Sequence, residues 1–155
     1  MQLRVTVRPR IAYARSVTDH VDVLIIGAGL SGIGAAAHLA KDLPATSYAV
    51  LERREASGGT WDLFRYPGVR SDSDMQTLGY RFKPWTGAKS IADGPSILQY
   101  LRDTAAEYGV DRRIRFGHLV KKAAWSSDTA RWTVTAERRD TRETVTFTCN
   151  YLFMG

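Results

Sequence analysis

Three glycines and one acidic residue stand at a spacing that has a defined chemical use. Gly27, Gly29 and Gly32 form the pattern G-x-G-x-x-G directly after an apolar run, and Glu52 ends a second apolar run further on. In such a pattern the first glycine makes a tight turn, the second lets a pyrophosphate approach the backbone, and the third lets a helix pack closely on a strand. The acid then takes the ribose hydroxyl groups of a dinucleotide. A glycine turn that binds nothing is the alternative that this motif leaves open.

The residues around this motif predict the elements that would position it. Residues 21–26 are β-branched, apolar and nearly uncharged, as in a strand that is buried on both faces of a parallel sheet. Apolar residues then recur at helical spacing from residue 28 to 39, and residues 48–51 predict a second strand. The loop therefore opens into a helix whose N-terminus, with its free N–H groups and positive dipole end, suits a diphosphate.

The acid and a second glycine pair indicate which dinucleotide binds. A carboxylate at Glu52 about 4 Å from a 2′-phosphate would cost about 4 kcal/mol at an effective dielectric near 20, which favours FAD or NAD over NADP at this site. Gly58 and Gly59, which follow Glu52 closely, again present backbone with no side chain, as FAD-binding domains commonly do. The pair favours FAD, although a glycine-rich surface turn is the alternative reading.

Composition limits the other classes of function. The 155 residues suffice for one domain, 44% are hydrophobic and 25% are charged, and no apolar stretch approaches the length of a membrane span. This composition favours a cytoplasmic protein. Half of the net charge of +6 lies in residues 1–20, and no nucleic-acid-binding motif accompanies it. We therefore predict no nucleic-acid partner, and we expect residues 1–20 to be a flexible basic extension, with a transit peptide as a minor alternative.

Histidine and cysteine do not indicate a metal site. The three histidines are scattered, and the single Cys149 excludes an internal disulfide and sits in an alternating, strand-like run. We expect Cys149 to be an inert, half-buried thiol. The sequence predicts no metal ligands and no histidine-centred triad.

Residues 62–86 have no sustained helix or strand period, and they are rich in aromatic, charged and turn-forming side chains. So long a loop is usually functional or disordered, and its aromatic residues argue against disorder. Arg65, Arg70, Asp72 and Asp74 surround a Pro-Gly turn. These charges either pair with one another on a solvated face or surround a cofactor and a phosphate.

The second half of the chain predicts one helix and a set of short strands. Residues 94–108 carry apolar side chains at helical spacing after Gly-Pro-Ser, and Gly109 ends the pattern. Four alternating runs, at residues 114–116, 119–125, 131–137 and 144–148, predict an antiparallel meander. Trp125 and Trp132 flank the turn at residues 126–130, which predicts cross-strand packing. Residues 151–154 then form the last strand of the nucleotide-binding sheet.

Three stretches together carry a more specific pattern: DVLIIGAGLSGIGAAAHL from residue 22, LERREASGGTWDLFRYPGVRSDSD from residue 51, and YRFKPW from residue 80. The combination resembles the N-terminal FAD-binding region of class B flavoprotein monooxygenases, and within them the Baeyer-Villiger type. The resemblance runs from about Val21 to the end of the chain. It implies an α/β fold, namely a Rossmann-like FAD-binding domain over residues 21–155 whose parallel sheet carries helices and an inserted small antiparallel meander.

The resemblance also implies site residues. By similarity, Gly27, Gly29, Ser31 and Gly32 would hold the FAD pyrophosphate, Glu52 the adenosine ribose, and Gly59, Thr60, Trp61, Asp62 and Leu63 the flavin end. Arg70, Ser71 and Asp72 would touch the nicotinamide side of NADP(H), with Asp72 also near the isoalloxazine as a catalytic candidate. Val120 would contact the adenine through its backbone.

Members of this family continue beyond the matched region with a second Rossmann domain for NADPH, so the resemblance implies a truncated chain. Two functions remain open. The first is the FAD-binding portion of an NADPH- and O2-dependent monooxygenase that oxygenates a ketone or a sulfur- or nitrogen-containing small molecule, with a second polypeptide as a candidate source of the missing domains. The second is a non-catalytic FAD-binding module.

Overall fold

The computed structural model describes residues 18–155, so residues 1–17 of the predicted basic extension lie outside the described residues. The described chain starts with β1 (Thr18–Ile26), α1 (Leu30–Asp42) and β2 (Tyr48–Leu51). Val23 to Ile26 pair in parallel with Tyr48 to Leu51, which confirms the predicted βαβ unit. Strand β1 begins three residues before the predicted start because Thr18, Asp19 and His20 pair with Thr146, Phe147 and Thr148, a distant segment.

The remaining elements follow in order: α2 (Thr60–Leu63), α3 (Met75–Leu78), α4 (Gly94–Glu107), a 3-10 turn η1 (Asp111–Arg113), β3 (Ile114–Arg115), β4 (His118–Ser126), β5 (Arg131–Arg138) and β6 (Thr144–Met154). Within the described residues one six-stranded sheet has the order β3-β2-β1-β6-β5-β4. Strands β3, β2, β1 and β6 are parallel, whereas β5 and β4 run antiparallel beyond β6. The predicted Rossmann-like sheet with an antiparallel meander is confirmed.

Two strand predictions were wrong in detail. Residues 114–115 do not join the meander, because they form β3 and pair in parallel with Val50 and Leu51. Residues 144–148 and 151–154 are not separate strands, since β6 runs unbroken from Thr144 to Met154. Its first half pairs with β5 on one side, and nearly its whole length pairs with β1 on the other, so one strand belongs to both the meander and the parallel sheet.

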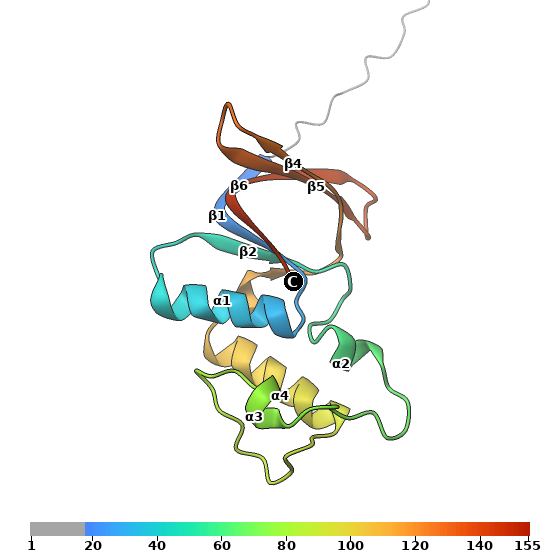
Figure 1. Ribbon diagram of the computed structural model, residues 1–155. Helices are drawn as coiled ribbons and strands as arrows, with labels where there is room; N and C mark the ends of the chain where they lie inside the picture. The colour runs from blue at the N-terminus through green and yellow to red at the C-terminus, as the bar shows by residue number, and fades with distance from the viewer. Residues whose placement is uncertain (1–17) are drawn as a thin grey trace, which may run out of the picture.

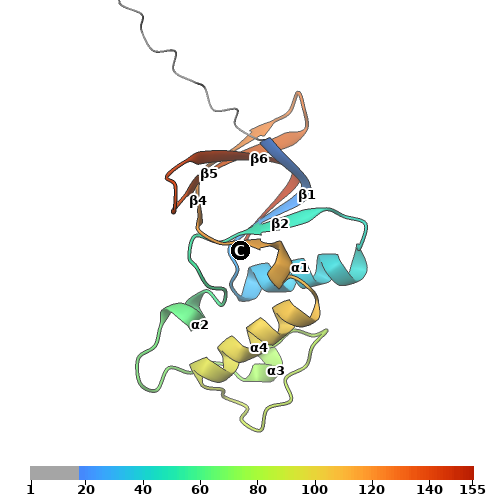
Figure 2. The same cartoon turned by 180° about the vertical axis from the view of Figure 1, so that it is seen from behind.

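Both faces of the central strands are buried, as their apolar sequence predicts. On one face Ile25, Tyr48 and Val50 pack against α1 and α4. On the other face Leu24 and Leu51 pack against inward-facing residues of the meander, namely Val134, Ala136, Phe147 and Cys149. Figures 1 and 2 show the resulting order of layers, with β4, β5 and β6 above, β1 and β2 between, and α1 and α4 below.

The structure confirms the predicted helix α4 and the predicted tryptophan pair, and it differs from the predictions for Cys149 and for the long loop. Helix α4 starts after Asp93, whose side chain accepts a hydrogen bond from the backbone N–H of Ser96. Trp125 lies opposite Trp132 with ring centroids 5.6 Å apart, so the predicted cross-strand pair is confirmed. Cys149 is fully buried rather than half-buried. The segment predicted to lack helix includes the end of α2 and the whole of α3, one-turn helices that are too short to produce a period.

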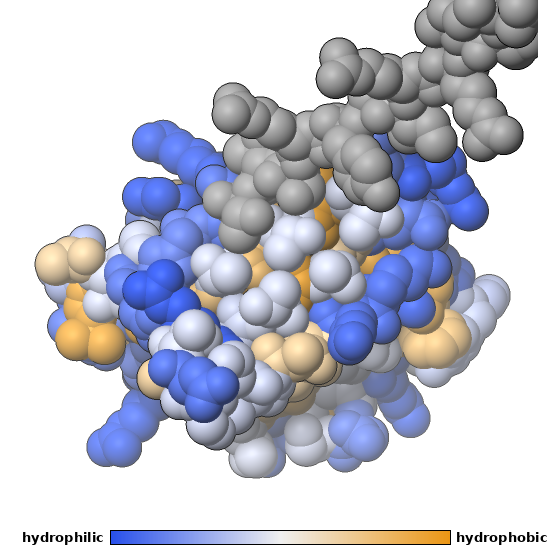
Figure 3. Space-filling model, turned by 90° about the horizontal axis from the view of Figure 1, so that it is seen from above, coloured by the Kyte–Doolittle hydropathy of each residue, from blue (hydrophilic) through white to orange (hydrophobic). Residues whose placement is uncertain are grey.

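The surface above the meander is mostly hydrophilic, with apolar side chains in small, separated groups (Figure 3). No helix formed by residues 18–155 is long and apolar enough to cross a membrane.

Candidate functional site

A cavity of about 510 Å³ lies where β1 and β2 end and α1 begins. Its wall combines the glycine loop, the end of β2, the second glycine turn and the start of β4: Ile26, Gly27, Gly29, Leu30, Ser31, Leu51, Glu52, Arg53, Arg54, Gly59, Thr60, Trp61, Leu63, His118, Leu119, Val120 and Gly155. Ligands of open α/β sheets bind in this position, outside the carboxyl ends of the strands. The structure therefore brings most of the predicted site residues to one cavity.

The three fingerprint glycines have different surroundings. Gly27 has φ +100°, and a Cβ on Gly32 would lie only 1.9 Å from the Gly27 carbonyl oxygen, which confirms the turn and the close helix packing predicted for these two. A Cβ on Gly29 would meet nothing closer than 3.5 Å, and the nearest atom is Cα of Gly59. The packing of the protein therefore does not strictly require a glycine at position 29, because a Cβ there would make an ordinary contact with the backbone of Gly59.

The N-terminus of α1 lines the cavity. Gly29 is the N-cap residue, no side chain caps the helix, and no acidic residue stands in its first turn. The first N–H groups of a helix have no acceptor within the helix, and they carry the positive end of its dipole. Ser31 lines the cavity on the exposed side of the same turn. The arrangement is suited to an anion such as a diphosphate.

Glu52 connects the glycine loop to the end of β2. Its side chain is only 6% exposed, Oε2 accepts a hydrogen bond from the Ala28 N–H at 2.9 Å, and Oε1 accepts one from the Arg54 N–H at 2.8 Å. A carboxylate has about four acceptor positions, so two remain for a ligand's hydroxyl groups. Glu52 thus holds the shape of the loop in addition to lining the cavity.

The second glycine pair packs directly on the first glycine loop. The Gly58 N–H donates to the Ala28 carbonyl at 2.8 Å, and Gly59 has φ 53° and is the N-cap residue of α2. A Cβ on Gly59 would lie 2.9 Å from Cα of Gly29. The pair is therefore a backbone-to-backbone contact, and the surface-turn reading of these glycines does not hold.

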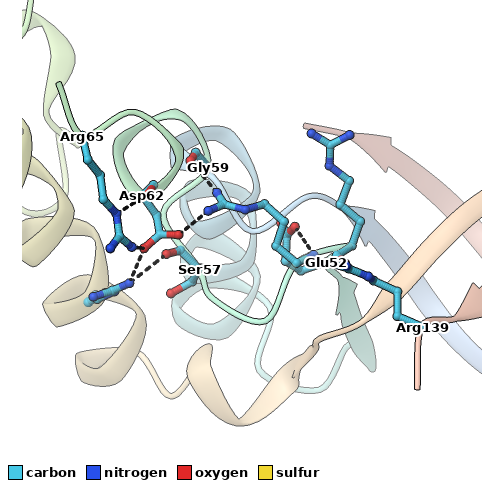
Figure 4. Close-up of polar contacts among 9 residues, drawn as sticks. Glu52, Ser57, Gly59, Asp62, Arg65 and Arg139 are labelled. Carbon is cyan, nitrogen blue, oxygen red and sulfur yellow. Dashed lines mark hydrogen bonds and ion pairs between the residues drawn. The ribbon is translucent and has the colours of Figure 1, made fainter. Parts of the chain in front are cut away.

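Asp62 differs from its neighbours Thr60, Trp61 and Leu63, which line the cavity. Its side chain is 2% exposed and turns away from the cavity toward arginine side chains. Figure 4 shows Asp62 beside Arg65 and Gly59, with dashed lines from its carboxylate to neighbouring guanidinium groups. Arg54, Arg65 and Arg102 all donate hydrogen bonds to this carboxylate. The structure does not place Asp62 where a cavity ligand would touch it.

Arg70, Ser71 and Asp72 line a second cavity, of about 550 Å³, together with Tyr66, Gly68 and Ile91. Ser71 is 2% exposed, and both its N–H and its hydroxyl oxygen are hydrogen-bonded to the backbone of Ala92. A third, mostly apolar cavity shares Trp61 with the first cavity and shares Tyr66 with the second. The segment that carries Trp61 and Tyr66 thus separates residues 70–72 from the glycine loop.

Other cavity residues were not predicted. Arg53 and Arg54 directly follow Glu52, and that position alone could have indicated them. His118 and Leu119 enter with Val120 at the start of β4, and no sequence signal linked that strand to the glycine loop apart from the family resemblance. Among residues 18–155, no group of three or more His, Cys, Asp or Glu side chains is arranged to hold a metal ion.

The fold and the cavity define a dinucleotide-binding domain of the Rossmann type, and residues 25–86 match the family model described as NAD(P)-binding Rossmann-like domain. The chain is 57% identical over 138 residues to the FAD-containing monooxygenase EthA of Mycobacterium tuberculosis, which covers 89% of this chain and 28% of EthA. It is 60% identical over 136 residues to the putative FAD-containing monooxygenase MymA of the same species, with 88% and 28% covered.

Solved structures agree with these relatives. The closed form of cyclohexanone monooxygenase matches with a TM-score of 0.79 and 28% identity over 90% of this chain and 26% of that chain. Oxidized steroid monooxygenase bound to NADP matches with a TM-score of 0.76 and 29% identity over 88% and 26%. Over the matched residues the chain corresponds to the FAD-binding part of flavoprotein monooxygenases of the Baeyer-Villiger type. It spans only about 28% of the length of the curated relatives.

Proposed function

We propose that this chain binds FAD in the first cavity and is the FAD-binding part of an NADPH- and O2-dependent monooxygenase that oxygenates a small organic molecule. The observation that carries the proposal is the uncapped N-terminus of α1, which lines the cavity where the two glycine turns meet. The protein's own packing leaves room for a Cβ at position 29. A backbone kept bare on the cavity side is what a bound diphosphate needs.

The proposed orientation of FAD follows from the cavity wall. The pyrophosphate lies against Gly27, Gly29 and Ser31 at the start of α1, while Gly32 keeps that helix close to β1. The adenosine ribose lies at Glu52, and the adenine lies near Val120. The flavin end extends past the second glycine turn, along the residues Gly59, Thr60, Trp61 and Leu63.

When bound, FAD supplies the redox chemistry. The residues of this chain bind and orient it. Glu52 accepts hydrogen bonds from hydroxyl groups while the Ala28 and Arg54 N–H groups keep its carboxylate in place. Apolar side chains such as Leu51 and Leu119 line the cavity wall and would limit the access of water to the polar contacts made there.

We further propose that Arg70, Ser71 and Asp72 face NADP(H), with Asp72 next to the flavin. A third cavity shares Trp61 with the first cavity and Tyr66 with theirs, and this succession of neighbouring cavities supports the assignment. Because the Ser71 hydroxyl is already bonded to Ala92, Ser71 contributes by fixing the backbone between Arg70 and Asp72. We place the protein in the cytoplasm, where NADPH is regenerated, and we propose a second polypeptide as its partner.

FAD titration of the purified chain, followed by quenching of flavin fluorescence, tests the proposal. We expect one FAD per chain. Gly29→Ala should weaken FAD binding at least about tenfold with little change in the stability of the free protein, because the new methyl group fits beside Gly59 but obstructs the approach of the pyrophosphate to the glycine loop. Gly32→Ala should instead destabilise the free protein, since its Cβ would overlap the Gly27 carbonyl. Unaltered FAD affinity in Gly29→Ala would refute the cavity assignment.

NADPH oxidation under air, with oxygen consumption recorded, separates the two functions that the sequence leaves open. FAD binding without NADPH oxidation is the result expected of an FAD-binding module. NADPH oxidation that depends on bound FAD is the result expected of a monooxygenase with a reductant site on this chain. Arg70→Ala would then be expected to raise the KM for NADPH and to leave FAD binding unchanged.

A further inference from the structure

We infer that Asp62 is a positioning residue which, through Arg54 and Arg102, fixes the Gly58–Gly59 turn in the place that the flavin end of FAD requires. This inference rests on the proposed function. It gives Asp62 a role different from the direct cofactor contact that the family resemblance implies. Three arginine side chains donate hydrogen bonds to this carboxylate, and two of them also bind backbone carbonyl groups of the turn.

Asp62 is buried and fully engaged. Arg54 Nη2 donates to Oδ2 at 2.5 Å, while Arg65 Nη2 and Arg102 Nη2 donate to Oδ1 at 3.1 and 2.9 Å. A single arginine would neutralise the carboxylate, so three of them exceed what charge balance requires. The three arginines come from different segments, after β2, after α2 and on α4. The carboxylate therefore joins three parts of the chain.

The same arginines also hold the backbone of the second glycine turn. Arg54 Nη1 donates to the Gly59 carbonyl at 3.1 Å, and Arg102 Nη2 donates to the Ser57 carbonyl at 3.4 Å. The Asp62 N–H donates to the Gly59 carbonyl at 3.2 Å. We call these residues, Asp62 with Arg54 and Arg102, the arginine clamp. The clamp therefore binds the backbone carbonyl groups of the two residues on either side of Gly58.

The position of this turn affects the cavity directly. The turn packs on the first glycine loop through the hydrogen bond between Gly58 and Ala28, and Gly59 itself lines the cavity. On the other side, a Cβ on Gly58 would lie 2.2 Å from Leu98 Cδ1 on α4. The turn therefore lies between the glycine loop and α4. The hydrogen bonds of the clamp hold the turn in its position relative to Gly29.

The clamp should affect the binding of the flavin end of FAD and not the binding of its adenosine diphosphate part. The adenosine and diphosphate meet Glu52 and the Gly27–Gly32 loop, which lie on the α1 side of the cavity. The flavin end must pass Gly59, Thr60 and Trp61, which belong to the clamped turn and to α2. ADP has the first part of FAD and lacks the second. A role in positioning therefore predicts unequal effects on FAD and ADP, whereas a general role in folding predicts equal effects.

The test compares FAD and ADP binding by calorimetry in the wild-type chain and in Asp62→Asn, which keeps the side-chain shape and removes the charge. We expect the FAD dissociation constant to rise about tenfold or more, and the ADP constant to stay within about twofold. Asp103→Asn is the matched control, because Asp103 is an exposed carboxylate on α4 next to Arg102. That control should bind both ligands as the wild type does.

Arg54→Lys provides a second variant in case Asp62→Asn does not fold. It keeps the charge, but an ammonium group lacks the planar fork with which Arg54 reaches both Gly59 and Asp62. We expect the same unequal loss of FAD and ADP affinity. Equal losses for the two ligands, or no loss, would overturn the inference while leaving the proposed function intact. A wild-type chain that binds neither ligand would overturn both.

Discussion

Gly29 and Gly59 lie against each other with no side chain between them, because a Cβ on Gly59 would stand 2.9 Å from Cα of Gly29. The first residue caps α1 and the second caps α2, so the two glycine turns of the cavity are in direct backbone contact. Gly59 also has φ 53° and ψ −124°, a conformation that side chains rarely adopt. A glycine is therefore required at position 59 for two independent steric reasons.

Replacing Gly59 by alanine should lower both stability and FAD affinity. The left-handed backbone and the contact with Gly29 together should reduce the free energy of unfolding by about 2–4 kcal/mol. Gly109→Ala is the matched control, since Gly109 has φ +65° with no atom within 4 Å of the added Cβ. It should lose only about 1 kcal/mol and bind FAD normally. Urea denaturation measures both, and equal losses in the two variants would contradict the role of the glycine contact.

Glu52→Gln should weaken the free protein as well as the complex. An amide can accept one of the two backbone hydrogen bonds, but its NH2 group would face the other N–H donor, from Ala28 or Arg54. Leaving such a buried donor unpaired should reduce the free energy of unfolding by about 1–3 kcal/mol. Glu55→Gln changes an exposed carboxylate nearby and should have little effect. If Glu52→Gln lowered FAD affinity but left the urea midpoint of the free protein unchanged, Glu52 would act on the ligand alone.

The local parts of the fold could be predicted from the sequence. The βαβ unit and α4 were predicted because their apolar spacing and end signals lie within one element. The continuity of β6 could not be predicted, because the alternation gives way to the uniformly apolar run 151–154 and the strand is completed by pairing with the distant β1. The place of β3 depends on a partner in β2. Both errors come from pairing between segments that are far apart in the chain.

In the candidate site, too, features set by neighbouring residues were predicted, whereas contacts between distant segments were not. The roles of Gly27 and Gly32 were predicted because each depends on backbone next to it in the loop. The burial of Asp62 was not predicted, since one of its partners, Arg102, lies 40 positions away on α4. The sequence left open whether the charges around the Pro-Gly turn pair with one another on a solvated face or surround a cofactor. Of these charges, Arg65 pairs with a residue outside that set, the buried Asp62.

The cap of α4 makes part of the stability depend on pH. The hydrogen bond from the Ser96 backbone N–H holds the pKa of Asp93 below its usual value. A carboxylate with a lowered pKa in the folded state stabilises that state above its unfolded pKa, near 3.9, and this contribution is lost as the pH falls through the folded value. Asn also caps helices but does not titrate. Melting temperatures between pH 6 and pH 3 should therefore fall less in Asp93→Asn than in the wild type, and parallel curves would contradict this.

Tyr100 fixes the segment that follows α3. Its hydroxyl accepts a hydrogen bond from the Tyr80 N–H at 2.7 Å and donates one to the Lys83 carbonyl at 2.6 Å, while its ring is 7% exposed in the core below α1. Tyr100→Phe keeps the ring and removes both hydrogen bonds, so the free energy of unfolding should fall by about 1–3 kcal/mol. Tyr151→Phe removes a hydroxyl from a side chain that is 62% exposed, and it should change stability little. Equal urea midpoints for Tyr100→Phe and Tyr151→Phe would mean that water replaces both bonds and that the segment holds its place through aromatic packing alone.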